Sequence, residues 1–242
     1  PRAPGFRPYR PQFAYLFNSY YEAVGDRWPR PARGLLSRPT VAEVYAYRHA
    51  VDEQMLALLE SAADHTLAEL GPVVELGLNH EEQHQELLYT DIKYILGHNP
   101  LFPPYCKDKP AGGLAPRQAH AEMLSIPEGI YEIGYQGDGF CFDNELQRHR
   151  VFLQPYSIST QLVSNREYLA FMEDGGYRDF RHWHAEGWDW VKTQQVAAPL
   201  YWHYIDGQWM HYTWQGLQPL SLDEPVCHIS FYEAAAYAAW KG

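Results

Sequence analysis

The feature that most constrains the fold is a segment rich in proline and glycine at residues 99–122, which separates two stretches of different character. Before it, apolar residues recur at helical spacing. After it, short β-like runs alternate with Gly, Asp and Asn turns. Five prolines and a Gly-Gly pair within the segment predict a linker or an extended arm. We therefore expect a helical domain at residues 1–98, a linker at 99–122 and an α+β domain at 123–242.

Three helices are expected in the first domain. Thr40 and Glu43 have the spacing of a capping box, so a helix should begin there and run to the Gly71-Pro72 pair. A second helix should extend from about Val73 to Leu96, where Gly97 ends it. A shorter helix is expected at residues 13–23.

The second domain is expected to mix strands and helices. Residues 130–133 and 150–153 have the β-branched and aromatic character of strands, and they are bounded by turn residues. Residues 164–173 and 230–240 have helical spacing instead. The sequence thus predicts an α+β domain with many irregular loops.

Charge and composition exclude several functions. The formal net charge is −11, with 19 basic against 30 acidic residues, which argues against a nucleic-acid partner. No apolar run approaches the ~18 residues that a membrane span requires, so we expect no membrane association. Three distant cysteines with no CxxC pair favour a reducing compartment, which predicts a cytoplasmic protein with structural cysteines. Small molecules remain as the expected partners.

His80 and His84 are the strongest candidates for chemistry. Residues four apart on a helix share a face, with Cβ atoms ~5–6 Å apart, so two imidazoles at this spacing can bind one metal ion. We expect this face to point into a helical bundle, because apolar positions continue it on both sides. These positions are Val73, Gly77, Leu87, Leu88 and Ile95.

Two other interpretations of this helix remain open. The two histidines can be ordinary surface or core residues. The segment also matches the HExxH pattern of zinc metallopeptidases, in which Glu81 would act as the general base. The third ligand that such a peptidase needs is not evident downstream.

The residues around this helix resemble the ergothioneine-biosynthesis sulfoxide synthases. The likeness is carried first by the run from His80 to Leu88 and by Thr90 to Lys93. Further matching segments occur in the family's order along the chain. They are residues 17–21, 33–39, 137–145, 165–168 and 225–231.

The resemblance implies a two-domain enzyme. Its fold would be an incomplete DinB-like helical bundle, followed by an incomplete formylglycine-generating-enzyme-like domain, a relative of the C-type lectins. The bundle would hold Fe(II) through three histidines, which include His80 and His84. The reaction would join a cysteine-type thiol to C2 of the hercynine imidazole with O2, and it would leave a sulfoxide. Open positions on the iron would accept the thiol and O2.

The resemblance also suggests substrate-binding and catalytic side chains. Tyr20 or Tyr21 would lie near the iron and supply a proton or a hydrogen bond, with ordinary packing as the alternative. Arg30 and Arg33 would bind a substrate carboxylate, with solvated loop charge as the alternative. Gln83 would reach polar groups of the substrate at the pocket edge. For the neighbouring Arg27 and Arg38 we favour solvated charge.

Other features of the sequence support narrower expectations. The resemblance implies that the family's first iron ligand lies on a helix before the point where this chain begins, and no histidine precedes His49, which is on a different helix. The third iron ligand is therefore expected upstream of Pro1, and the chain is expected to be an inactive middle fragment. Most tryptophans should be core residues rather than a cage for a trimethylammonium group. Residues 143–145 should form a turn rather than a calcium site. Cysteine and γ-glutamylcysteine both stay open as the thiol. A zinc hydrolase or a non-catalytic binding protein remains the alternative function.

Overall fold

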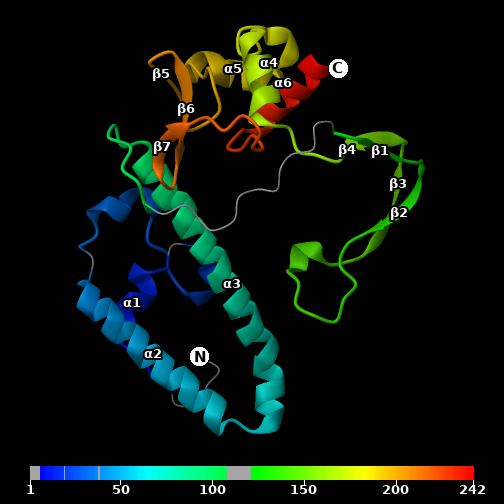
Figure 1. The fold of residues 1–242 in the computed structure, drawn as a ribbon. Coiled ribbons are helices and arrows are strands. Elements are labelled where there is room, and N and C mark those ends of the chain that lie inside the picture. The colour runs from blue at the N-terminus through cyan, green and yellow to red at the C-terminus, as the bar shows by residue number, and fades with distance from the viewer. Residues whose placement is uncertain (1–5, 19, 38, 108–120) are drawn as a thin grey trace. The chain divides into compact units, whose positions relative to one another are not determined.

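The computed structural model describes residues 6–18, 20–37, 39–107 and 121–242. It divides into two compact units, Pro1–Leu78 and Asn79–Gly242, and the boundary falls inside the long helix α3 (Asp64–Gly97). Figure 1 labels the helices and strands. The domain limits at 98 and 123 remain a prediction, because the boundary between compact units at 78/79 does not test them. Arg38 and most of the predicted linker lie outside the described residues.

The first unit contains short helices and the long helix α2. Its elements are α1 (Pro11–Leu16), η1 (Glu22–Val24), η2 (Arg30–Leu35), α2 (Val41–Ser61) and the start of α3. Thr40 and Glu43 form the predicted capping box: the Thr40 hydroxyl accepts from the Glu43 N–H at 3.3 Å, and Glu43 accepts from the Thr40 N–H at 3.0 Å. The predicted start of α2 is confirmed.

The predicted end of this helix is wrong. Helix α2 ends at Ser61, because the backbone of Ala62 is extended. Helix α3 then runs from Asp64 through Pro72 without interruption. A proline inside a helix destabilises the helix by about 3 kcal/mol. The proline removes one hydrogen bond at its own position, and α3 stays helical on both sides of it. Asp64 in the first turn favours the new helix start, because a negative charge there complements the helix dipole. Gly97 ends α3 as predicted.

The short first helix is also shorter than predicted. It ends at Leu16 rather than extending to Ala23. The cause is Asn18, whose side-chain amide donates to the carbonyls of Tyr21 and Gly25 at 2.7 and 3.2 Å and so bends the backbone into a loop.

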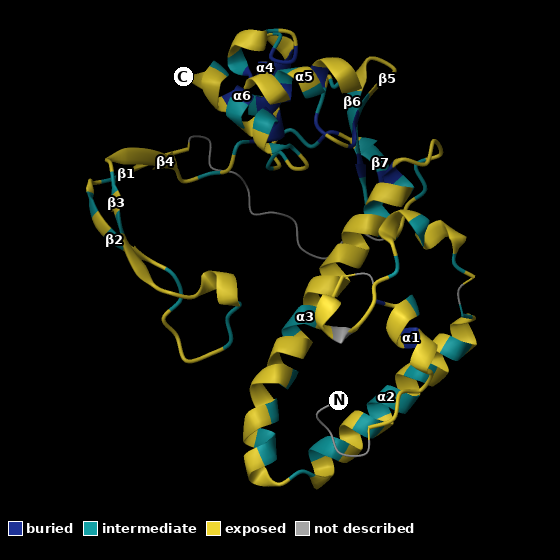
Figure 2. Cartoon of the chain, turned by 180° about the vertical axis from the view of Figure 1, so that it is seen from behind, coloured by how far each residue is buried: buried dark blue, intermediate teal, exposed yellow. Residues whose placement is uncertain are grey.

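We expected the apolar stripe of α3 to be buried in a helical bundle, but in the structure it is exposed. Val73, Leu87, Leu88 and Ile95 each keep more than half of their surface exposed, and Gly97 is the one buried residue of α3 within the described part of the chain. Figure 2 shows α2 and α3 mostly in the colours of exposed and half-buried residues. The DinB-like bundle therefore remains a prediction.

The second unit contains two antiparallel strand pairs between residues 123 and 159. β1 (Met123–Ile126) pairs with β4 (Tyr156–Ser159), and β2 (Gly129–Ile133) pairs with β3 (His149–Leu153). The predicted strands at 130–133 and 150–153 are confirmed and face each other in register, with Ile130 opposite Phe152. Residues 143–145 form the short helix η3, so the predicted turn is confirmed.

The hydrophobic core lies in the C-terminal half of the second unit. It is built from α4 (Asn165–Glu173), η4 (Phe180–His182), α5 (Ala185–Gln194), α6 (Phe231–Lys241) and the sheet β5–β6–β7 (Trp202–Ile205, Gln208–Thr213, Gly216–Pro219). Capping boxes begin α4 and α6 at the predicted positions, Ser164 and Ser230. Figure 2 shows the buried residues gathered here.

Aromatic side chains fill this core. Tyr168 and Phe171 are fully buried, and Trp183 and Trp202 are nearly so. Trp188, Trp190 and Trp209 pack against the cluster. Most of the tryptophans are thus packing residues, in agreement with the sequence analysis.

A polar network crosses the same core. Tyr177 donates to the buried carboxylate of Glu233 at 2.5 Å, and the Tyr168 hydroxyl lies 3.1 Å from that of Tyr177. Burial is the first cause that raises the pKa of both tyrosines, so both remain protonated. Glu233 also caps α6 by accepting from the Ser230 N–H at 2.6 Å. The network therefore ties the start of α6 to the loop that follows α4.

The C-terminal end of α3 packs against the β5–β6–β7 sheet. A Cβ added at Gly97 would lie 2.8–2.9 Å from ring atoms of Tyr201 and Tyr212, so only glycine allows this approach. Tyr89, two turns earlier, contacts the ring of Trp214 with centroids 5.6 Å apart. Among the described residues, no helix has both the length and the apolar character needed to cross a bilayer.

Candidate functional site

His80 and His84 lie side by side on α3. Their ring centroids are 4.5 Å apart and their planes are inclined at 68°. His80 is half-buried and His84 is exposed. Because the helix positions the two rings one turn apart, the pair is formed by α3 alone.

The donor set of this pair suits a transition metal. Neutral imidazoles bind iron, zinc and copper, and a centroid separation of 4.5 Å lets two rings approach one ion at ~2.0–2.2 Å per ligand. In the part of the chain that the structure describes, no third His, Cys, Asp or Glu joins them in a metal-binding group. The described residues thus fit two of the ligands of a metal centre.

Glu81 and Gln83 lie between the two histidines in the sequence, and both side chains are exposed. Each is adjacent in sequence to one of the two histidines, so it lies about 100° around the helix from that neighbour. Their exposure makes both accessible to a ligand beside the pair. The roles of Gln83 in substrate binding and of Glu81 as a base stay predictions.

A second group of predicted residues meets in the first unit. Tyr20 and Arg30 line a cavity of about 540 Å³ together with Arg27, Trp28 and Pro29. The Arg30 guanidinium carbon lies 5.5 Å from the centroid of the Tyr20 ring, a cation–π distance. A cavity with two guanidinium groups on its wall can hold a carboxylate, because Arg forms bidentate hydrogen bonds to such anions.

For Arg27 the sequence analysis favoured solvated loop charge. In the structure it instead forms an ion pair with Glu22, donates to the Tyr20 carbonyl at 3.4 Å and lines the cavity. Arg33 lies one turn after Arg30 in η2, and residues three apart on a 3-10 helix point to the same side. Neither Arg33 nor Tyr21 lines the cavity.

Asn18 organises this loop, and the sequence analysis assigned it no role of its own. Its side chain is buried, and its carbonyl oxygen accepts from the N–H groups of Tyr20 and Tyr21 at 3.3 and 3.0 Å. Its amide donates to carbonyls on the far side of the turn. An Asn directly after a short helix was the available signal, because Asn side chains commonly organise turns.

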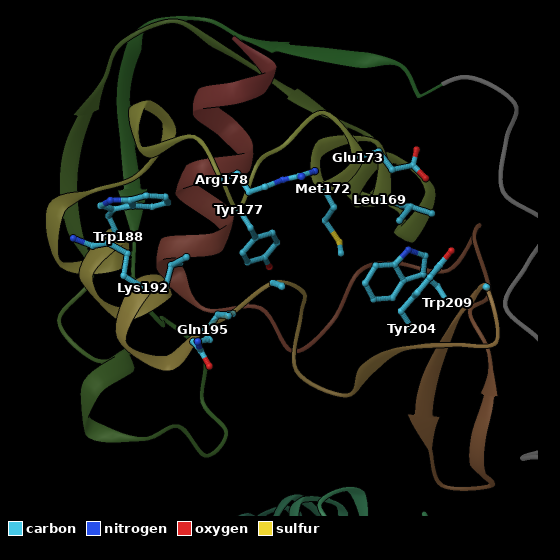
Figure 3. A pocket seen from close by; sticks show the side chains of 14 residues that line it. Leu169, Met172, Glu173, Tyr177, Arg178, Trp188, Lys192, Gln195, Tyr204 and Trp209 are labelled. Carbon is cyan, nitrogen blue, oxygen red and sulfur yellow. The ribbon is translucent and has the colours of Figure 1, made fainter.

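The structure therefore brings His80 to His84, and it separately brings Tyr20 to Arg30. The first pair belongs to the second compact unit and the tyrosine cavity to the first. A second cavity, of about 1000 Å³, lies in the C-terminal half of the second unit. Figure 3 shows Trp188 on one side of it and Trp209 with Tyr204 on the other.

The chain belongs to the family of the sulfatase-modifying factor enzyme 1-like domain. Residues 111–242, more than half of the chain, match the model of this family. The predicted formylglycine-generating-enzyme-like domain is thereby confirmed. The formylglycine-generating enzyme of Thermomonospora curvata is 30% identical, over 53% of this chain and 46% of its own length.

Within this class, the chain resembles the hercynine oxygenases. The hercynine oxygenase of Mycolicibacterium thermoresistibile is 28% identical over 100% of the chain and 50% of its own length. That of Mycolicibacterium smegmatis is 32% identical over 69% of the chain and 38% of its length. The chain thus spans half or less of the length of these curated relatives. The first of these alignments includes the α3 helix with His80 and His84.

Proposed function

We propose that this chain is part of a hercynine oxygenase that makes a sulfoxide in ergothioneine biosynthesis. The observation that carries the proposal is the His80–His84 pair, which lies on one helix of a chain that resembles hercynine oxygenases over its whole length. The thiol substrate would be cysteine or γ-glutamylcysteine. The second substrate would be hercynine and the oxidant O2.

The proposed reaction balances with one O2 per turnover. A C–S bond forms between the thiol sulfur and C2 of the imidazole, and the C2–H and S–H hydrogens leave with one oxygen atom as water. The other oxygen atom remains on sulfur as the sulfoxide. O2 accepts four electrons, and the C–H, S–H and sulfur centres supply them.

His80 and His84 would hold Fe(II) as neutral imidazole ligands. When bound, Fe(II) would supply open coordination positions for the thiol and O2. Gln83, adjacent to His84, would orient polar groups of the imidazole substrate by hydrogen bonding. Arg30 and Arg33 would bind the carboxylate of the thiol substrate through their guanidinium groups.

Tyr20 is the proposed proton donor, in preference to Tyr21. Its ring is exposed, it lines the cavity with Arg30, and the guanidinium of Arg30 lies over its face. This position leaves Tyr20 accessible to a ligand in the cavity, where its hydroxyl could donate a hydrogen bond or a proton.

The test uses the full-length protein that contains this chain. The protein is loaded anaerobically with Fe(II) or with Zn(II) and mixed with hercynine and either thiol, and O2 is then added. We expect the sulfoxide, identified by mass, with Fe(II) alone, and the more efficient thiol identifies the substrate. Peptide hydrolysis that requires Zn(II) and Glu81, without sulfoxide, would establish the zinc hydrolase instead. A protein that binds neither metal would be a binding protein.

A further inference from the structure

A small polar cavity lies in the second unit, where the C-terminal part of α3 meets the segment before α6. Its volume is about 180 Å³, and its polar lining includes Lys93, His211, Glu224, Cys227 and His228. Apart from the structural role expected for the cysteines, none of these residues was assigned a role above. Lys93 follows His84 by nine residues, which at ~100° per residue places it on the opposite side of α3. The cavity is therefore separate from the histidine pair.

Lys93 is the cation of this cavity. Its ammonium donates to Nε2 of His228 at 2.7 Å and lies 5.0 Å from the centroid of the Tyr201 ring. An ammonium has three donors, and these contacts use one of them in a hydrogen bond. Within the described residues Lys93 has no carboxylate at ion-pair distance. Burial lowers the pKa of the half-buried Lys93, because its charge is costly there unless an anion or water compensates it.

The two histidines are neutral donors beside this ammonium. Because the ammonium can only donate, Nε2 of His228 accepts and the ring proton lies on Nδ1. Burial first, and the Lys93 charge second, lower the pKa of His228 to about 4. Burial also lowers the pKa of His211, whose ring nitrogens have no hydrogen-bond partner among the described residues. A neutral imidazole offers one N–H donor, so His211 is free to donate to a ligand.

We propose that this cavity binds a small carboxylate, with Lys93 as the counter-charge and His211 as a neutral hydrogen-bond donor. The volume of about 180 Å³ accommodates a simple carboxylate or a small α-amino acid. Glu224 on the cavity wall distinguishes the two sources. Its carboxylate repels a simple anion, whereas it attracts the ammonium of an α-amino acid. The proposal does not depend on the proposed oxygenase function, because the cavity and the histidine pair lie on opposite sides of α3.

The test titrates the full-length protein with sodium acetate, glycine or sodium chloride at constant ionic strength. The readout is the ring signals of His211 and His228 in NMR spectra of histidine-labelled protein. We expect saturable shifts with acetate or glycine and none with chloride. Tighter binding of glycine identifies an α-amino acid site, and tighter binding of acetate identifies a simple carboxylate site. Equal shifts with chloride, or no shift with either carboxylate, would overturn the proposal.

Lys93→Met provides the residue-specific test, with Lys192→Met as its control. Met keeps an unbranched side chain of nearly the same length without the charge, so affinity for the carboxylate should fall roughly 10- to 100-fold, the effect of losing one charge-assisted hydrogen bond. Lys192 is exposed on α5 and pairs with Asp189, so its loss should leave affinity unchanged. Unchanged affinity in folded Lys93→Met would refute the site. If that variant does not fold, Glu224→Gln decides: acetate should then bind more tightly, and unchanged or weaker binding counts against the proposal.

Discussion

The ring centroids of His80 and His84 lie 4.5 Å apart on one face of α3, at a separation that two ligands of one metal ion can share. This contact arises from the geometry of a single helix and needs no other element. It is therefore the part of the candidate site that a substitution in α3 tests most directly.

His84→Ala in the full-length protein should remove most Fe(II) affinity and abolish sulfoxide formation. Losing a residue that only orients a ligand typically weakens metal binding ~10–100-fold, and losing a ligand should cost more. His65→Ala is the matched control, because His65 is exposed on the same helix away from the pair. Anaerobic Fe(II) titration measures the effect. If the two variants bind Fe(II) with equal affinity, His84 is not a ligand of the metal.

Glu81→Gln should retain most sulfoxide synthase activity. The proposed reaction assigns Glu81 no proton transfer, and the side chain is exposed. Steady-state rates of the iron-loaded variant and the parent give the comparison, with Glu82→Gln, another exposed acid of α3, as the control. An inactive Glu81→Gln beside an active Glu82→Gln, together with zinc as the metal, would favour the hydrolase.

Gly97→Ala should lower the free energy of unfolding by about 1–3 kcal/mol, the usual cost of overpacking. The new methyl group would lie 2.8–2.9 Å from the rings of Tyr201 and Tyr212. Gly77→Ala on the same helix has no atom within 4 Å of the added methyl and should instead stabilise the protein by roughly 0.5–1 kcal/mol. Urea unfolding measures both. Equal effects of the two changes would mean that α3 does not pack on the sheet in this way.

Tyr177→Phe should destabilise the protein by roughly 1–3 kcal/mol, because it leaves the buried Glu233 oxygen without its donor. Tyr204→Phe is the control, since the ring of Tyr204 is exposed and its hydroxyl is accessible to water. Thermal and urea unfolding give the two differences. A loss for Tyr177→Phe no greater than that for the control would contradict the network.

The stability of the second unit should fall as the pH is lowered from about 6.5 towards 4. His228 has its pKa lowered from 6.5 to about 4 in the folded chain, so between these values the unfolded chain binds more protons, and acid favours unfolding. Above pH 6.5 the histidine is neutral in both states and its contribution is constant. His228→Gln should flatten the curve of unfolding free energy against pH in this window, whereas His65→Gln should not. Identical slopes for parent and His228→Gln would exclude His228 as the group responsible.

Local sequence signals predicted the starts of three helices correctly. Thr40 with Glu43, and the serines at 164 and 230, each cap a helix through side chains three residues apart, so no distant contact is needed. The strand at 130–133 was predicted from its β-branched and aromatic residues and the turn residues around them, which are also local signals. The Gly71-Pro72 pair misled because a proline only disfavours a helix locally, and α3 continues through it.

The contacts of the candidate sites also separate into those that follow from local sequence and those that depend on tertiary packing. The sequence by itself determined the His80–His84 pair, because an i,i+4 spacing on a helix brings two rings together wherever that helix lies. Only the tertiary structure decided that Lys93 meets His228, 135 residues further along, and that Gly97 packs on Tyr201 and Tyr212. Such contacts depend on how distant segments pack, and single side chains carry no local signal of the partner they will meet.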